Sequence, residues 1–197
     1  MGKIFMILGK SASGKDTIVS EVRKSIPYNL ELVVPYTTRP MRPGEVEGEQ
    51  YHFITEEEMN AIPEEMVIER RCYDTVNGDW YYLNLKKDID LEHKSYIIIG
   101  TIPVLEAFRE IYKEDVIAIY IYADAKERLL RSINRSNGTV NDMKEICRRF
   151  LKDEEDFSSD HITYQQINLL VPNNGNYKAA AQSITNFILK DMAGSLV

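Results

Sequence analysis

Glycine, serine and lysine residues near the start of the chain have the spacing of a phosphate-binding loop. The segment 9–17 reads G-K-S-A-S-G-K-D-T, follows an apolar run at 4–8 and precedes a predicted helix. Strand, glycine-rich loop and helix together are the context that a Walker A motif, G-x-x-x-x-G-K, requires. Gly9 and Gly14 let the backbone turn around a phosphate, and Lys15 adds a point charge. The residues predicted to hold the phosphates of a nucleoside triphosphate are Gly9, Lys10, Ser11, Ala12, Ser13, Gly14, Lys15, Asp16 and Thr17.

One position departs from that motif. Serine or threonine normally follows the lysine and offers its hydroxyl to Mg²⁺, but here Asp16 follows it and Thr17 comes next. A carboxylate is a hard oxygen ligand that suits Mg²⁺, and its charge beside a polyphosphate needs the metal or a nearby arginine. We therefore expect Mg²⁺ to accompany the nucleotide, with Asp16 as a ligand directly or through water.

A second set of anion-binding residues lies in the proline- and glycine-containing stretch 35–50. Arg39 and Arg42 can form a guanidinium fork around a monophosphate, with a bidentate geometry that two lysines lack. Tyr51 adds a neutral donor to the same phosphate. The plain alternative is a solvated loop in which these arginines form salt bridges with its glutamates.

The same stretch resembles the guanylate kinase signature, T-T-R-x-x-R-x-G-E-x-x-G-x-x-Y-x-F. Every fixed position of this pattern is met at 37–53, and the resemblance extends over nearly the whole chain. It implies a kinase that transfers the γ-phosphate of ATP to GMP, and to dGMP, with Mg²⁺ as cofactor. It also implies that Arg39, Arg42 and Tyr51 grip the acceptor phosphate.

The resemblance assigns further residues to the GMP site. Glu69 ends a predicted strand where the family has a glutamate that accepts hydrogen bonds from guanine N1 and N2, which adenine cannot offer. Tyr81 matches the tyrosine of the family's G-N-x-Y-G-[TS] element, which contacts the nucleotide phosphate. Thr101, just after a buried strand, is also placed in this site.

Several positions differ from the family's pattern in that site. Tyr82 and Leu83 follow the tyrosine in place of glycine and a hydroxyl residue, and Pro35 replaces a serine that binds guanine. The acidic element L-D-I-D is replaced at 98–101 by I-I-G-T, so neither aspartate is present. We expect Asp16 to compensate for the lost acidic support of the metal.

Arginines repeat at helical spacing in the predicted lid. Arg128, Arg131 and Arg135 fall on one helix face, and the resemblance matches Arg131, Arg135 and Arg149 to lid arginines. Convergent guanidinium groups suit phosphoryl transfer because charge spreads over the transferred oxygens. Salt bridges between neighbouring turns are the alternative, favoured for Arg128. The residues predicted to be catalytic are Lys15, Arg39, Arg131, Arg135 and Arg149, and Asn173 is predicted to lie near the adenine.

Alternating buried strands and helices after residue 85 predict an α/β fold with a parallel sheet. With the resemblance, this becomes a three-layer P-loop NTPase-type sheet with an inserted small lobe and a helical lid. A helix is expected over 86–92, and a turn at Asn77-Gly78. The predicted division is a core of 1–34, 85–125 and 160–197, a monophosphate-binding lobe of 35–84 and a lid of 126–159.

Composition narrows the function classes. The net charge of −7 argues against a general nucleic-acid binder, and no apolar run is long enough to span a membrane. Cys72 and Cys147 lack metal-ligand neighbours and are expected to be reduced thiols. We therefore expect a cytoplasmic monomer or homodimer, without a signal peptide, whose partners are the small nucleotides ATP and GMP.

Two other functions stay open. The segments 14–17, G-K-D-T, and 98–101, I-I-G-T, also resemble ribose 1,5-bisphosphate phosphokinases, which would change the acceptor. A guanylate-kinase-like interaction module that has lost catalysis and binds peptide is the other alternative. Against the module, the phosphate-loop lysine and the lid arginines are retained.

Overall fold

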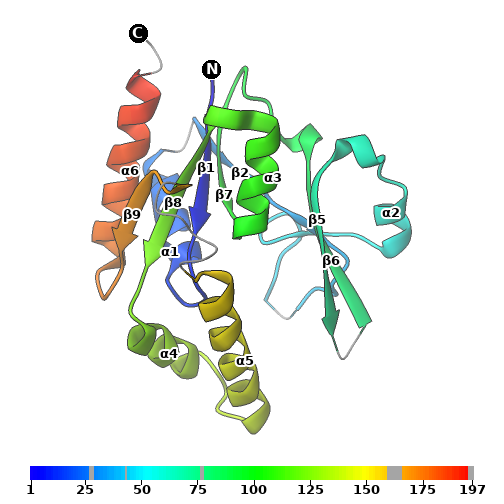
Figure 1. Ribbon diagram of the computed structural model, residues 1–197, viewed down its shortest axis with the longest axis vertical. Helices are drawn as coiled ribbons and strands as arrows, with labels where there is room; N and C mark the ends of the chain where they lie inside the picture. Colours follow the sequence, from blue (N-terminus) through cyan, green and yellow to red (C-terminus); the bar gives the residue numbers. More distant parts are fainter. Residues whose placement is uncertain (27–28, 43, 76–77, 159–165, 195–197) are drawn as a thin grey trace.

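A parallel sheet of five strands forms the centre of the molecule (Figure 1). The computed structural model describes residues 1–26, 29–42, 44–75, 78–158 and 166–194. Along the sheet the strands are β2 (Leu30–Leu32), β7 (Ser95–Ile99), β1 (Ile4–Leu8), β8 (Val116–Tyr122) and β9 (Leu169–Pro172), and each neighbouring pair runs parallel. A parallel sheet is covered on both faces, which explains why β1 is one continuous apolar run.

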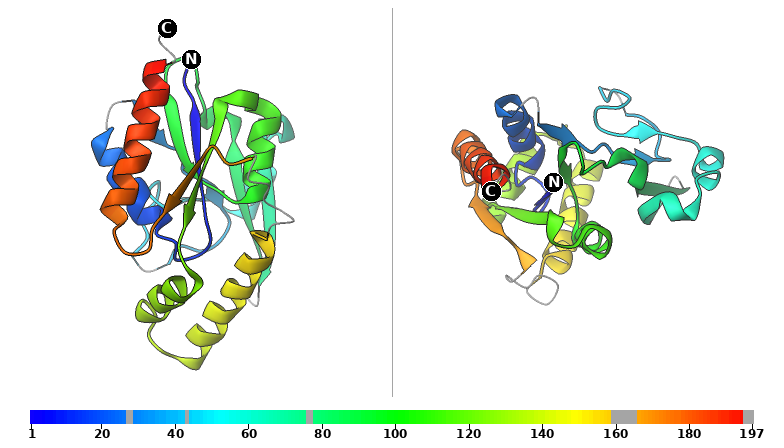
Figure 2. Two further views of the ribbon diagram at one scale, coloured as in Figure 1. Left: turned by 60° about the vertical axis from the view of Figure 1, so that its left-hand side comes forward. Right: turned by 90° about the horizontal axis from the view of Figure 1, so that it is seen from above.

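Successive residues of β1 point to opposite faces of the sheet and so enter two hydrophobic clusters. Phe5 and Ile7 pack with α1 (Lys15–Ser25) and α6 (Tyr177–Gly194). The other three residues of the strand pack with α3 (Ile102–Tyr112). Seen from above in Figure 2, these helices lie on opposite sides of the sheet. The predicted three-layer α/β fold is confirmed.

A second, four-stranded sheet projects to one side of the first (Figure 1). Its strands, in spatial order, are β4 (His52–Phe53), β3 (Tyr36–Thr37), β6 (Gly78–Leu85) and β5 (Val67–Thr75). β5 and β6 pair antiparallel over most of their length. The short helix α2 (Glu56–Asn60) is capped by Thr55, which forms a complete capping box with Glu58.

Two helices lie beyond the carboxyl ends of β1 and β8 (Figure 1). They are α4 (Ala125–Asn134) and α5 (Val140–Asp156), and Thr139 caps α5 with a second capping box. Ligands of open parallel sheets bind at this carboxyl edge. None of the helices in the described ranges has the length and apolar character that a membrane crossing needs.

The helix predicted over 86–92 is wrong. Only a single 3₁₀ turn, η2 (Lys86–Asp88), forms there. The N–H of Asp90 donates instead to the hydroxyl of Tyr96 at 2.9 Å, a tertiary bond that diverts the backbone from a helical ladder. Of the predicted turn, Asn77 lies outside the described residues. The division of the chain into core, lobe and lid at the stated boundaries stays a prediction.

Candidate functional site

The loop between β1 and α1 turns at two glycines whose conformations other residues avoid. Gly9 has φ 149° and Gly14 has φ 98°. A Cβ on Gly9 would lie 2.5 Å from the carbonyl oxygen of Ile121, and one on Gly14 would lie 2.5 Å from Nδ2 of Asn173. The loop therefore requires glycine at both positions, as the motif predicts.

Lys15 begins α1 and folds back over this loop. Its Nζ donates to the carbonyl oxygens of Gly9 at 2.6 Å and Lys10 at 3.1 Å. Burial lowers the pKa of its ammonium group, while the charges of Asp16 and Asp153 oppose that change. The ammonium group is thus held within the loop that is predicted to cradle phosphates.

Two acidic residues of α5 bind the same loop. The N–H of Ser11 donates to Oδ2 of Asp153 at 2.7 Å, and Nζ of Lys10 pairs with Glu154 at 2.6 Å. Arg128 is only 3% exposed and pairs with both carboxylates. Arg128 therefore forms salt bridges with α5, as the alternative interpretation of this arginine predicts. The carboxylate of Asp153 therefore accepts a hydrogen bond from a backbone N–H group of the loop that is predicted to bind phosphate.

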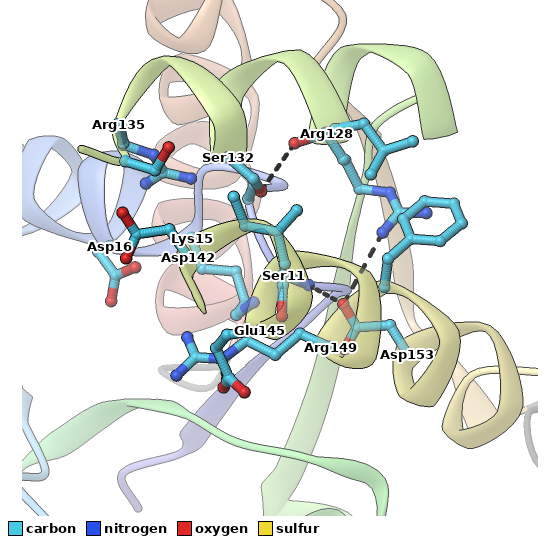
Figure 3. A pocket seen from close by; sticks show the side chains of 15 residues that line it. Ser11, Lys15, Asp16, Arg128, Ser132, Arg135, Asp142, Glu145, Arg149 and Asp153 are labelled. Carbon is cyan, nitrogen blue, oxygen red and sulfur yellow. Dashed lines mark hydrogen bonds and ion pairs between the residues drawn. The ribbon is translucent and has the colours of Figure 1, made fainter. Parts of the chain in front are cut away.

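Two of the predicted catalytic arginines, Arg135 and Arg149, line a cavity of about 450 Å³ between the phosphate loop and the helices α4 and α5 (Figure 3). Lys15, Asp16, Arg135 and Arg149 line it. Within this cavity Arg149 pairs with Glu145 at 2.6 Å, on the same helix. The structure thus brings these predicted cations to one space, with Arg149 already held by a carboxylate.

Arg131 lies on the other side of the loop. Its guanidinium donates to the carbonyl oxygens of Ala12 at 3.3 Å and Asn173 at 2.8 Å. The Asn173 side chain is buried and donates to the carbonyl oxygen of Ser13 at 2.8 Å. Both residues line a second cavity of about 380 Å³ together with Thr17. Their side chains shape the phosphate loop, while the adenine contact of Asn173 stays a prediction.

Arg39 and Arg42 do not form the predicted fork in this structure. Arg39 is 3% exposed and makes two hydrogen bonds to Glu45, at 3.0 and 2.7 Å. The backbone N–H of Arg42 donates to the same carboxylate at 2.7 Å. The guanidinium of Arg39 also lies 5.3 Å from the ring centroid of Tyr51. The salt bridge within the loop is therefore the arrangement present, and a phosphate would have to displace or join Glu45.

Glu69 lies on the face of β5 that turns toward the start of α3. Its side chain is 7% exposed, and its Oε1 lies 2.6 Å from Nε of Arg71. Nη1 of Arg71 donates to Oγ1 of Thr101 at 2.9 Å. Burial raises the pKa of Glu69, and the positive charge of Arg71 opposes the rise. Two of the predicted GMP-binding residues, Glu69 and Thr101, are therefore joined through an arginine.

Tyr81 does not lie on this face. Cross-strand pairs share a face, and the register pairs Arg71 with Tyr82 but Cys72 with Tyr81. Tyr81 consequently packs against the cluster containing Leu83. Tyr82 instead lies 5.5 Å from the ring of Tyr51, measured between centroids. Because side chains alternate along β6, the tyrosine on the face of Glu69 is Tyr82 rather than Tyr81.

Tyr51 lies between Arg39 and Tyr82. Burial is the main cause of its raised pKa, followed by Tyr82. The charges of Arg39, Asp16 and Arg71 also act on its hydroxyl. We name the surface formed by Arg39, Tyr51, Glu69, Arg71 and Tyr82 the acceptor face. Its tyrosine hydroxyl lies within electrostatic reach of the first turn of α1.

The family model described as Guanylate kinase matches residues 1–182. The chain belongs to the guanylate kinase family. Guanylate kinase 2, chloroplastic/mitochondrial, of Oryza sativa subsp. japonica is 28% identical over 188 residues, which are 94% of this chain and 63% of that protein. The guanylate kinase of Thermotoga maritima is 32% identical over 144 residues, covering 66% of this chain and 64% of that protein.

A solved structure shares the fold of this family member. The crystal structure of guanylate kinase from Anaplasma phagocytophilum aligns with a TM-score of 0.63 at 20% sequence identity. The alignment covers 96% of this chain and 86% of that one. The match supports the arrangement of a parallel sheet with helices on both sides. The chain spans less than two-thirds of the length of the rice relative that it matches.

The cavity suits Mg²⁺ bound together with a polyphosphate. Asp16 lies in the first turn of α1 and lines the cavity beside Lys15. Mg²⁺ keeps several waters and takes one or two carboxylates plus substrate phosphates, rather than a cage of protein ligands. The described residues contain no cluster of three or more acidic, histidine or cysteine side chains suited to a metal. Asp16, which adjoins the phosphate loop, fits that mode of binding as one of the carboxylates that line the cavity.

Arg71, Tyr82 and Asp153 are site residues that the sequence did not single out. Period-two alternation would have placed Arg71 on the face of Glu69 if the predicted strand that ends at Glu69 had been extended to Thr75, the observed end of β5. The side chain of Tyr82 could be placed only with the cross-strand register of β5 and β6. No local signal marks Asp153, whose partner Ser11 is 142 residues away.

Replacing Gly14 with alanine should destabilise the protein more than the same change at Gly138. Both glycines have positive φ, 98° and 77°, but a Cβ on Gly138 meets nothing within 4 Å. A left-handed alanine costs about 1–2 kcal/mol at either position. Displacing Asn173 at Gly14 should add about 1 kcal/mol through its lost hydrogen bond. Urea unfolding measures both changes, and equal losses would contradict the packing argument.

Proposed function

We propose that this protein transfers the γ-phosphate of ATP to GMP, and to dGMP, with Mg²⁺. The main support is the buried Glu69 on the acceptor face with Arg39 and Tyr51, where the charge of Asp16 in the first turn of α1 also acts on the pKa of Tyr51. A buried carboxylate suits a base edge with two adjacent donors, which guanine has. Membership of the guanylate kinase family supports the same reaction.

In this reaction an oxygen of the GMP 5′-phosphate bonds to the γ-phosphorus of ATP. The bond from that phosphorus to the leaving oxygen breaks, giving GDP and ADP. Residues 9–17 would hold the donor phosphates, and Lys15 would offset their charge. Arg39, Arg42 and Tyr51 would hold the acceptor phosphate. Bound Mg²⁺, with Asp16 as ligand, would neutralise charge on the donor phosphates.

The lid arginines would complete the transfer site. Arg131, Arg135 and Arg149 already lie around the cavities next to the phosphate loop. Closing over both nucleotides, they would exclude water that would otherwise hydrolyse ATP. Bound phosphates would replace Asp153 as the acceptor for the N–H of Ser11 and Glu45 as the partner of Arg39. The enzyme is proposed to act in the cytoplasm on these small nucleotides.

A ribose bisphosphate kinase remains the competing proposal because Asp16 and the missing L-D-I-D element match it. Its acceptor carries no base, so it would have no use for the buried Glu69. An interaction module without catalysis would not need Lys15 within the loop. In an acceptor screen, each of these alternatives predicts a result that differs from that of a GMP kinase.

The screen offers GMP, dGMP, AMP and ribose 1,5-bisphosphate in a coupled assay for ADP. We expect turnover with GMP and dGMP, little with AMP, and none with the sugar bisphosphate. The variant Lys15→Ala should lose turnover by about a hundredfold or more, as for a charge that stabilises the transition state. Absence of GMP turnover at millimolar concentration would reject the proposal.

The pH dependence of GMP use should report on Glu69. Its pKa is raised by burial above the ordinary value of 4.5. As pH falls through that raised pKa, the carboxylate gains a proton and loses acceptor capacity. On acidification, kcat/KM for GMP should therefore begin to fall while the pH is still above 4.5. The variant Glu69→Gln should lack this acidic decline and have a kcat/KM lower by about ten- to a hundredfold. Glu64→Gln is the control and should keep the acidic decline. If Glu69→Gln also keeps it, the decline belongs to another group.

Removing the carboxylate of Asp153 should strengthen ATP binding. Asp153 accepts the N–H of Ser11 and lies near Lys15, so it competes with phosphate for both. A charged hydrogen bond contributes about 1.5–3 kcal/mol, and ATP must break the one between Ser11 and Asp153 before its phosphates can use that N–H group. Without this cost, Asp153→Ala should bind Mg-ATP about tenfold more tightly than the wild-type protein. Calorimetric titration with Mg-ATP measures it, with Asp156→Ala on the same helix as control. Unchanged or weaker binding would contradict competition by Asp153.

A further inference from the structure

Arg71 has a distinctive place on the acceptor face. Its Nε lies 2.6 Å from Oε1 of Glu69, and its Nη1 donates to Thr101 at 2.9 Å. The side chain of Arg71 is 22% exposed, against 7% for Glu69. The guanidinium is therefore fixed between two predicted acceptor-site residues and retains contact with solvent.

The pair is incompletely satisfied. Among the described residues, neither oxygen of Glu69 receives a well-formed hydrogen bond, and Nε of Arg71 makes none despite its short distance, although Arg71 and Asn84 lie close enough to lower the pKa of Glu69. Buried charged groups without aligned hydrogen bonds are costly to keep. Oδ1 of Asn84, paired with Glu69 across the strands, is also buried without a partner. These atoms together indicate a surface that is completed by a ligand with both donors and acceptors.

Guanine has such an edge. O6 accepts, while N1 and N2 beside it donate. We propose that Arg71 donates to O6 of guanine while Glu69 accepts from N1 and N2, which makes Arg71 a residue that determines base specificity. The inference rests on the proposed GMP kinase function. Arginine commonly donates to O6 of guanine in nucleic-acid recognition for the same chemical reason.

Thr101 is then a positioning residue. Its hydroxyl accepts from Nη1 of Arg71 and fixes the guanidinium, which has five donors in a planar fork. Tyr82 and Leu83 supply no short hydroxyl at the positions following Tyr81. A donor to O6 is therefore provided by Arg71 on β5 instead. Adenine would present its N6 donor to this guanidinium and leave both groups unpaired.

The test compares GMP with 6-thio-GMP, in which a sulfur atom replaces O6 and N1–H and the N2 amino group are kept. Sulfur is a weak hydrogen-bond acceptor. The wild-type enzyme should prefer GMP by about tenfold or more in kcat/KM. In Arg71→Ala, kcat/KM for GMP should fall by about ten- to a hundredfold, the preference over 6-thio-GMP should disappear, and KM for ATP should stay unchanged.

Arg70→Ala is the matched control. Arg70 is the neighbouring arginine of β5 but pairs with Glu64 at 3.1 Å, away from the acceptor face. Its removal should leave the preference for GMP intact. If Arg71→Ala does not fold, as judged by thermal melting, Arg71→Lys takes its place. Lysine keeps a positive charge beside Glu69 but lacks the fork, so the preference should still fall.

Failure of the inference and failure of the proposed function give different results. A wild-type protein that does not phosphorylate GMP would reject the function. A wild-type protein that uses GMP and 6-thio-GMP equally would overturn the role of Arg71 alone. So would Arg71 variants that lose both substrates in equal proportion, because that pattern reports structural damage.

Discussion

Buried positive charge needs an anionic partner, and this requirement organises the whole candidate site. Charged groups withdrawn from water are stable only when they are paired. In this structure several cations of the site have a carboxylate beside them, among them Lys10 with Glu154 and Arg39 with Glu45, whereas Nζ of Lys15 donates to backbone carbonyl oxygens. The same holds in the lid, where Arg149 binds Glu145. The protein thus holds several of its cations in place with its own acids.

These pairs couple three parts of the chain. Asp153 and Glu154 attach α5 to the phosphate loop, so a phosphate bound in that loop would compete for the groups that hold α5. Glu45 holds Arg39 against Tyr51, and Tyr51 lies within the field of Asp16. Replacing carboxylates by phosphates exchanges one ion pair for another. Such an exchange changes the net free energy less than the creation of a new pair would, so the arrangement can respond to ligands.

The acceptor face shows how strand alternation selects residues. On β6 the neighbours Tyr81 and Tyr82 point to opposite sides, and only Tyr82 joins Tyr51. On β5, Glu69 and Arg71 point to the same side because they are two positions apart. The sequence resemblance identified Glu69 and missed Arg71, since a family pattern records matching residues and does not show a new neighbour. The extension of β5 beyond Glu69, together with the contacts of Arg71 with Glu69 and Thr101, supplied that neighbour.

The sequence alone determined the fold class, the phosphate loop and the family, because glycine spacing and continuous apolar strands depend on local chemistry. The glycines at 9 and 14 and the two-faced packing of β1 follow directly from it. Only the tertiary structure decided which cations are paired with which acids, since Ser11 and Asp153 are 142 residues apart. It also decided that Tyr82 faces the acceptor site, because strand register depends on pairing between distant residues.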